Sequence, residues 1–275
     1  MRVSYRNEVT DLERPARPTI AEIREVCQPP AIRGRTNSEH WVADVYLRDI
    51  SPYLTKQLLK TPITANQVTW LMVATGSSAA VALLIPGIWG PLLAVFLGQM
   101  QMLWDCCDGE VARWRRKSSP MGVFIDRVGH YTTEGLIPIA LGLRAAGFPN
   151  DGWLDSIWPF LGALLSVIIL YNKALNDMVH VSRAYNDLPK LVDKAAVGVP
   201  SNTGLRNLRS IAKFFPFHRA YHSVELTILI LVAGIVDLFV GDLGATRVLL
   251  VALLCFGVVT IVGHLASILS SSKLR

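Results

Sequence analysis

Six long apolar segments constrain the fold of this 275-residue chain more than any other feature. Hydrophobic residues make up 51% of the sequence and charged residues only 17%. A transmembrane helix needs about 20 mainly apolar residues. Runs of this kind lie at residues 67–86, 88–104, 121–146, 153–172, 224–241 and 245–270. The second and fourth helices are expected to continue to residues 116 and 185. The sequence therefore predicts an all-α integral membrane protein with six transmembrane helices.

The region before the first span has a different character. Residues 1–45 are polar and contain several prolines, which predicts a partly flexible cytoplasmic extension and not a signal peptide. The membrane domain is expected over residues 46–272. It would open with a short amphipathic helix in which Ser51 is the N-cap and Pro52 lies in the first turn. Such a helix suits the membrane interface, and a solvated cap on the bundle is the alternative.

Positive charge is concentrated at one side of the predicted bundle. Of the 27 lysines and arginines, only Arg144 and Arg247 lie near the opposite ends of the helices. Because cytoplasmic loops are enriched in Lys and Arg, we expect both termini to face the cytoplasm. The net charge of +6 suits anionic lipid headgroups and phosphorylated substrates. The sequence has no basic patch interleaved with aromatic residues, so it does not suggest binding to nucleic acid.

Two of the predicted helices carry polar residues at helical spacing, near their cytoplasmic ends. Positions three, four and seven apart share a helix face. On each helix such a face combines carboxylates or an imidazole with small residues. These residues are Asp105, Asp108, Gly109, Ala112, Gly122, Asp126 and His130. Carboxylates at a membrane edge are costly unless cations neutralise them, and hard divalent cations prefer oxygen ligands. The pattern therefore predicts a metal site that carries out chemistry.

The two cysteines inside this pattern do not indicate a zinc site. Cys106 and Cys107 are adjacent, so on a helix they point about 100° apart. They would not converge with the carboxylates on one ion, and we interpret them as small packing residues.

Four other residues are candidates for ligand contacts. Asn66 and Thr69, at the start of the first span, would either cap that helix or hydrogen-bond a ligand. Lys173 and Arg219 each lie beside a span in the long basic connection 173–222. They suit the phosphate of an acceptor substrate, and they equally suit lipid headgroups.

The spacing of the polar pattern resembles the signature of the CDP-alcohol phosphotransferase (CDP-alcohol phosphatidyltransferase) family. That signature is Asp-x2-Asp-Gly-x2-Ala-Arg-x8-Gly-x3-Asp-x3-Asp. The sequence matches it from Asp105 through Arg113 to Asp126 and departs from it at the last position, where His130 replaces aspartate. The resemblance extends over about residues 45–272.

The resemblance implies transfer of a phosphoalcohol group from a CDP-alcohol to an acceptor hydroxyl, with release of CMP. The donor would be CDP-diacylglycerol or a soluble CDP-alcohol, and the acceptor a polar alcohol, a lipid or a phosphorylated polyol. The family further implies Mg²⁺ or Mn²⁺, as two ions, and a homodimer. The implied metal ligands are Asp105, Asp108, Asp126 and His130, with Asp126 and His130 also catalytic. The implied nucleotide-binding residues are Asn66, Thr69, Asp108, Gly109, Ala112, Arg113 and Gly122.

His130 leaves several interpretations open. An imidazole suits a base near neutral pH, it is an ordinary metal ligand, and it could instead mark a family member that has lost activity. A lipid-binding or transport protein is the alternative from another class, although the carboxylates cluster at one membrane face and no inverted repeat is visible.

Overall fold

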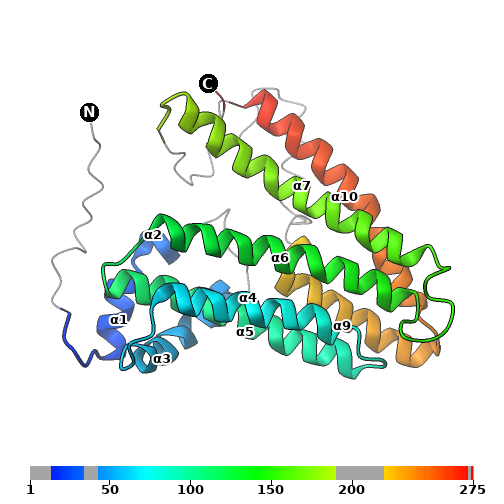
Figure 1. The fold of residues 1–275 in the computed structure, drawn as a ribbon, viewed down its shortest axis with the longest axis horizontal. Helices are drawn as coiled ribbons and strands as arrows, with labels where there is room; N and C mark the ends of the chain where they lie inside the picture. The colour runs from blue at the N-terminus through cyan, green and yellow to red at the C-terminus, as the bar shows by residue number, and fades with distance from the viewer. Residues whose placement is uncertain (1–13, 34–42, 190–219, 272–273, 275) are drawn as a thin grey trace.

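The computed structural model describes residues 14–33, 43–189, 220–271 and 274, and every regular element in this part of the chain is helical. Six long helices occupy the six predicted apolar ranges (Figure 1). They are α4 (Ala65–Ala82), α5 (Trp89–Trp114), α6 (Pro120–Ala145), α7 (Trp158–Tyr185), α9 (Ser223–Val240) and α10 (Gly244–Ser270). The fourth of these begins later than residue 153 because the residues before Trp158 form turns.

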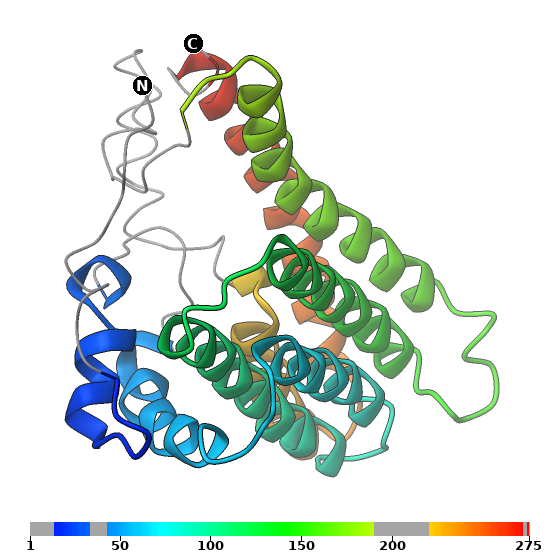
Figure 2. The same cartoon turned by 60° about the vertical axis from the view of Figure 1, so that its left-hand side comes forward.

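The long helices form a bundle from which one pair diverges. Helix α4 packs on α5 and α6, α9 packs on α5, and α7 packs on both α6 and α10. Helices α7 and α10 run side by side and diverge from α6 toward their C-terminal ends (Figures 1 and 2). Between the helices lies an apolar core whose fully buried members include Leu83, Leu141, Leu165, Leu226, Ile230 and Leu250.

The contact between α6 and α7 depends on two glycines. A Cβ atom on Gly142 would lie 2.6 Å from the carbonyl oxygen of Trp158 and 2.7 Å from the Cα atom of Gly162. A Cβ atom on Gly162 would lie 2.6 Å from the carbonyl oxygen of Pro138. The two backbones can therefore approach this closely only where both helices lack side chains. The first turns of α7 are thereby held against α6, and α7 extends from there toward the other end of the bundle.

Side-chain caps define where α4 and α6 begin. Thr64 caps α4 in a capping box with Gln67, so neither Asn66 nor Thr69 caps that helix. At the start of α6, the hydroxyl of Ser119 accepts a hydrogen bond of 3.0 Å from the backbone N–H of Gly122. Pro120 occupies the first helical position, where its missing N–H costs nothing.

Part of the N-terminal extension is folded onto α5. The extension contains α1 (Ile20–Cys27) and α2 (Pro30–Arg33), and the π-helical segment η2 (Ala43–Leu47) and α3 (Arg48–Leu58) follow at the start of the membrane domain. Helix α1 begins at a capping box and buries Ile23, Val26 and Cys27 against Trp114, at the end of α5. The sequence patterns did not indicate this packing.

The sequence predicted Ser51 as the N-cap of the short helix before the first span, and this prediction is wrong. Helix α3 begins one turn earlier, at Arg48, and Ser51 and Pro52 lie inside it. Proline has no N–H to donate to the carbonyl four residues before it, which here is the carbonyl of Arg48. Gln28 Nε2 donates a hydrogen bond of 2.6 Å to that carbonyl instead. The extra turn is thus compatible with Pro52, because Gln28 at the end of α1 supplies the hydrogen bond that the proline cannot donate.

A buried carboxylate holds α3 on α5. Glu110 is fully buried, and its two oxygens accept hydrogen bonds from Ser51 Oγ (2.5 Å), Thr55 Oγ1 (2.6 Å) and Gln28 Nε2 (2.8 Å). Ser51 and Thr55 of α3 are therefore turned inward beside Leu54 and Leu58, and its apolar Ile50 and Tyr53 are exposed.

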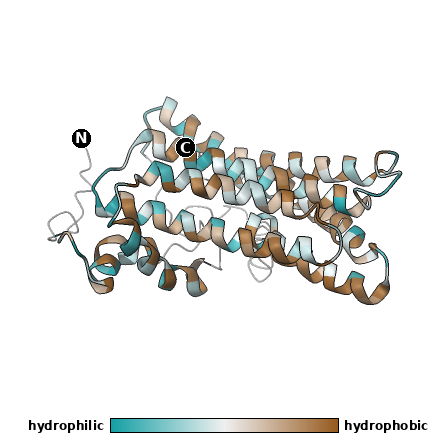
Figure 3. Ribbon diagram, turned by 60° about the horizontal axis from the view of Figure 1, so that its bottom comes forward, coloured by the Kyte–Doolittle hydropathy of each residue, from teal (hydrophilic) through white to brown (hydrophobic). Residues whose placement is uncertain are grey.

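Three of the described helices, α7, α9 and α10, are long and apolar enough to cross a membrane. Hydrophobic residues cover much of the long helices (Figure 3). The apolar residues that face outward include Phe160 and Val167 on α7 and Val259 and Val262 on α10. This distribution is that of a membrane-inserted bundle.

Replacing Gly142 with alanine is expected to destabilise the fold, because the added methyl group would overlap the backbone of α7. Overpacking of this kind typically costs about 1–3 kcal/mol, so the melting temperature of the detergent-purified protein should fall. Gly263→Ala on α10 is the matched control, because nothing lies within 4 Å of a Cβ atom at that position. Equal melting temperatures for the two variants would contradict the close crossing.

Candidate active site

A polar cavity lies at the end of the bundle that carries α1, α2 and α3. Its volume is about 450 Å³. Acidic and basic side chains share its wall. The lining residues with charged or imidazole side chains are Arg48, Asp105, Asp108, Arg113, Asp126, Arg127, His130, Glu134, Lys173 and His222. A cavity with this lining suits a ligand that carries phosphate groups or metal ions.

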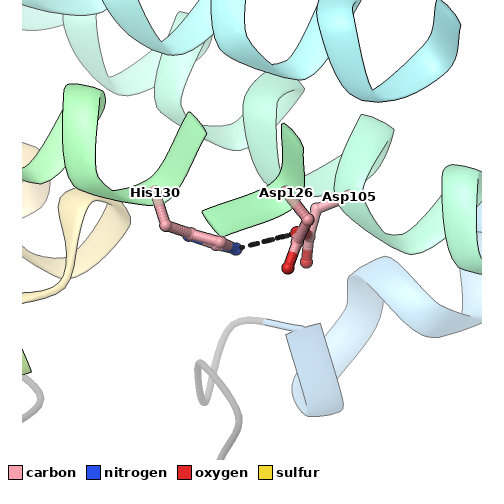
Figure 4. A group of neighbouring side chains, drawn as sticks. All are labelled: Asp105, Asp126 and His130. Carbon is pink, nitrogen blue, oxygen red and sulfur yellow. Dashed lines mark hydrogen bonds and ion pairs between the residues drawn. The ribbon is translucent and has the colours of Figure 1, made fainter. Parts of the chain in front are cut away.

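Three of the predicted residues converge in this cavity. Asp105 projects from α5, and Asp126 and His130 project from the same face of α6 (Figure 4). His130 Nε2 lies 3.2 Å from Asp105 Oδ1 and 3.5 Å from Asp126 Oδ1. One candidate ligand atom from each residue lies within 4.8 Å of the other two. The helical spacing of 126 and 130 thus produces the predicted common face.

Asp108 lies beside this group and is held from the opposite side by α4. The hydroxyl of Thr69 donates a hydrogen bond of 2.7 Å to Asp108 Oδ2. Thr69 does not line the cavity itself, so the structure places it behind a carboxylate. Asn66 lies one turn earlier, next to Gly122: a Cβ atom on this glycine would be 3.0 Å from Asn66 Oδ1. The start of α4 therefore contacts α5 and α6, the two helices that carry the signature.

The small residues of the signature have local packing roles in the structure. A Cβ atom on Gly109 would lie 2.8 Å from Arg113 Nη1, so the glycine leaves room for the arginine to fold back along α5. Arg113 Nε donates a hydrogen bond of 2.7 Å to the carbonyl of Cys27, at the end of α1. Gly109 and Arg113 line the cavity, whereas Ala112 and Gly122 are not among its described lining residues.

A second polar group occupies the other side of His130. Glu134 is almost fully buried, and its Oε1 lies 2.8 Å from Lys173 Nζ, 3.6 Å from His222 Nδ1 and 4.0 Å from His130 Nδ1. Lys173, predicted as an anchor for an acceptor phosphate, thus lies on the cavity wall but is paired with a carboxylate. Arg219, the other predicted anchor, lies outside the described residues.

Three of the four cysteines are buried, and one of these, Cys106, also lines the cavity. Cys106 and Cys107 are buried in an apolar cluster between α3, α4, α5 and α9. Cys27 is buried as well, and burial together with the nearby Glu110 carboxylate raises the pKa of its thiol to about 12. A thiol with such a pKa stays protonated at neutral pH, and only a thiolate is an effective metal ligand or nucleophile.

The residues present fit a divalent metal ion. Asp105, Asp126 and His130 offer two oxygens and one nitrogen, and Asp108 adds a further carboxylate on the same cavity wall. Hard divalent cations prefer this oxygen-rich donor set. Carboxylates gathered this closely in an apolar bundle repel each other unless positive charge lies between them.

Comparison with known families agrees with this geometry. Residues 62–186, which run from the start of α4 to the end of α7, match the CDP-alcohol phosphatidyltransferase family. This match identifies residues 62–186 as similar to a CDP-alcohol phosphatidyltransferase domain. The family belongs to the transferases, and its members transfer phosphoalcohol groups in lipid biosynthesis. No curated protein matches the sequence at a significant level.

Some lining residues of the transferase domain and its surroundings were not indicated by the sequence. Glu134 lies four positions after His130, so the same helical spacing that joins Asp126 to His130 could have identified it. Arg48 and His222 carry no such signal, because they reach the cavity from α3 and from the residue before α9. Only the tertiary structure brings them to the site.

Asp105→Asn is expected to weaken binding of Mn²⁺ to the purified protein by about tenfold or more, since loss of even an indirect ligand contact typically costs 10–100-fold. Electron paramagnetic resonance of free Mn²⁺ would measure this change. Asp155→Asn is the matched control, because Asp155 is exposed in the loop between α6 and α7. Unchanged affinity in Asp105→Asn would contradict the metal site.

Proposed function

We propose that this protein is an integral membrane, metal-dependent CDP-alcohol phosphotransferase. It would transfer a phosphoalcohol group from a CDP-alcohol to an acceptor hydroxyl and release CMP. The observation that carries this proposal is the convergence of Asp105, Asp126 and His130 in a cavity that Arg113 also lines. These residues lie inside the matched family domain.

The proposed membrane arrangement has six spans, with α4, α5 and α6 crossing beside the three more apolar helices. Both termini and the cavity would face the cytoplasm, in keeping with the positions of the lysines and arginines. Helix α3 would lie in the membrane interface. Its outward Ile50 and Tyr53 support this placement, since exposed apolar side chains on a short helix suit the acyl boundary. A homodimer is proposed from the family resemblance alone.

In this proposal the aspartates would hold two divalent ions, Mg²⁺ or Mn²⁺. Such ions neutralise charge on phosphoryl oxygens and polarise phosphorus toward attack. Asp105, Asp108 and Asp126 are the proposed ligands, and Thr69 fixes the orientation of Asp108 through its hydrogen bond. The guanidinium of Arg113 is suited to pair with a phosphate oxygen of the nucleotide. Asn66, Gly109, Ala112 and Gly122 would shape the nucleotide pocket.

Proton transfer is assigned to His130. Attack by the acceptor hydroxyl forms a new O–P bond and breaks the P–O bond to CMP, and the hydroxyl proton must leave. Nε2 of His130 faces Asp105 and Asp126, so it is placed to accept that proton near the reacting phosphorus. If Nε2 instead binds an ion, His130 is a fourth ligand, and the two roles differ in their effect on metal affinity.

The acceptor is proposed to be anchored by Lys173 and Arg219 if it carries a phosphate. Lys173 Nζ is a three-donor group, so it can contact an anion in the cavity while it remains paired with Glu134. Lys173 and Arg219 also suit a lipid headgroup. The assay described next therefore includes both CDP-diacylglycerol and soluble CDP-alcohols as donors.

We expect the purified protein to release CMP from at least one CDP-alcohol in the presence of Mg²⁺ or Mn²⁺. The panel would combine CDP-diacylglycerol and soluble CDP-alcohols with polar, lipid and phosphorylated polyol acceptors. Chelation of divalent ions and Asp105→Ala should each abolish release, because the phosphoryl charge is then uncompensated. Tight nucleotide binding without CMP release from any pair would indicate a catalytically degenerate protein.

His130→Asp is expected to retain CMP release, because it restores the last aspartate of the family signature. His130→Ala should slow it by about 100-fold or more, the usual contribution of a general base. Mn²⁺ affinity separates the two roles of the imidazole. An unchanged affinity in His130→Ala supports the base, and a loss equal to that of Asp105→Asn supports the ligand. Full activity of His130→Ala would exclude both.

A further inference from the structure

The wall of the cavity extends beyond the matched family domain. Ile32 from α2, Ala43 from η2 and Arg48 from α3 line it, and all three precede residue 62, where the family match begins. Helices α1 and α2 together form the α1–α2 segment (residues 20–33). The family match assigns no role to this segment, although it borders the candidate active site.

The end of α1 is bonded to the arginine of the signature. The last carbonyl groups of a helix have no partner within that helix and attract cations. The carbonyl of Cys27, the last residue of α1, is such a group, and it accepts a hydrogen bond of 2.7 Å from Arg113 Nε. The α1–α2 segment therefore contacts the side chain that is proposed to pair with the nucleotide.

This hydrogen bond leaves the other two nitrogens of the guanidinium group for a ligand. A guanidinium is planar, and its five N–H groups point in fixed directions. Nη1 and Nη2 lie against Gly109 on the cavity wall, at 2.8 and 3.1 Å from the position that a Cβ atom would take there. Among the residues that the structure describes, Nη1 and Nη2 have no hydrogen-bond partner. Their N–H groups are therefore available to an anion in the cavity.

The α1–α2 segment holds the Cys27 carbonyl firmly in place. Ile23 is fully buried against Trp114, at the end of α5. Gln28 Nε2 donates hydrogen bonds to the carbonyl of Arg48 (2.6 Å) and to Glu110 Oε1 (2.8 Å). Ordering a long side chain during binding normally costs affinity. Because the Arg113 guanidinium is already ordered by α1, that loss of freedom accompanies folding and not ligand binding.

We propose that the α1–α2 segment is part of the donor site and positions Arg113 for a phosphate of the nucleoside diphosphate. With Nε held by the Cys27 carbonyl, Nη1 and Nη2 form a fork that matches two phosphate oxygens. This inference rests on the proposed function, because it assumes a CDP-alcohol donor. It also implies linkage: if docking of α1 strengthens nucleotide binding, nucleotide binding strengthens docking of α1 by the same factor.

Ile23→Asp tests this role by releasing α1, since an unpaired carboxylate at a fully buried apolar position is strongly unfavourable. We expect the Kd for CDP, measured by calorimetry with Mg²⁺ and no acceptor, to rise by about threefold to tenfold. Mn²⁺ affinity should stay unchanged, which shows that the bundle is folded. Ala21→Asp is the matched control, because Ala21 is exposed on the same helix. Equal CDP affinity in Ile23→Asp and the wild type would overturn the proposal.

A double variant shows whether α1 acts through Arg113. Arg113→Ala should weaken CDP binding, and adding Ile23→Asp to it should cause almost no further loss, because the guanidinium that α1 positions is absent. If Ile23→Asp instead weakens CDP binding equally with and without Arg113, the segment supports the site by another route. That result would overturn the positioning role.

Cys27 provides a measurement in the wild-type protein. Its thiol is buried, and Sγ lies 3.3 Å from the carbonyl oxygen of Glu110 on α5, so alkylation requires α1 to open. CDP with Mg²⁺ should slow alkylation of Cys27 more than that of Cys107, which is buried in the cluster between α3, α4, α5 and α9. Mass spectrometry of the labelled peptides would measure both rates. Equal slowing at the two cysteines would contradict the linkage and overturn the proposal.

These binding measurements separate this inference from the proposed function, because they need no turnover. Absence of CDP binding to the wild-type protein with Mg²⁺ would refute the proposed donor site and this inference together. CDP binding that is the same in the wild type and in Ile23→Asp would overturn this inference alone.

Discussion

The need to accommodate carboxylates at one end of an apolar bundle organises the rest of this structure. Glu110 and Glu134 are almost completely buried there, and protein groups compensate both. Glu110 takes neutral donors from α1 and α3, and Glu134 takes the ammonium of Lys173 from α7. Glu110 thereby holds α3 against α5, and Glu134 holds α7 against α6. The aspartates between them face the cavity, where their charge is available to ligands.

This constraint explains why α3 turns polar side chains toward the bundle. A short helix beside a core normally buries its apolar side. Here Glu110 draws Ser51 and Thr55 inward, because a buried carboxylate without donors would cost more than two exposed apolar residues. Ile50 and Tyr53 are exposed as a consequence. In a lipid interface that exposure is favourable, so one inward hydrogen-bond network and one outward apolar surface satisfy the same helix.

The sequence predicted those features that depend on local periodicity. Six apolar runs located the six long helices, and the four-residue spacing of Asp126 and His130 located the centre of the site. The features it did not predict depend on contacts between distant segments. The start of α3 depends on Gln28, which satisfies the carbonyl that Pro52 leaves free. The role of Thr69 depends on where α4 meets α5, and no spacing within α4 contains that information.

His130 shows why a departure from a signature has to be judged in three dimensions. From the sequence alone, loss of the last aspartate removes one negative charge and is compatible with a degenerate site. In the structure, Nε2 of this histidine keeps the position facing Asp105 and Asp126, and a buried carboxylate lies behind Nδ1. The imidazole therefore keeps a polar side chain at the place of the missing aspartate, so the departure alone does not indicate a degenerate site.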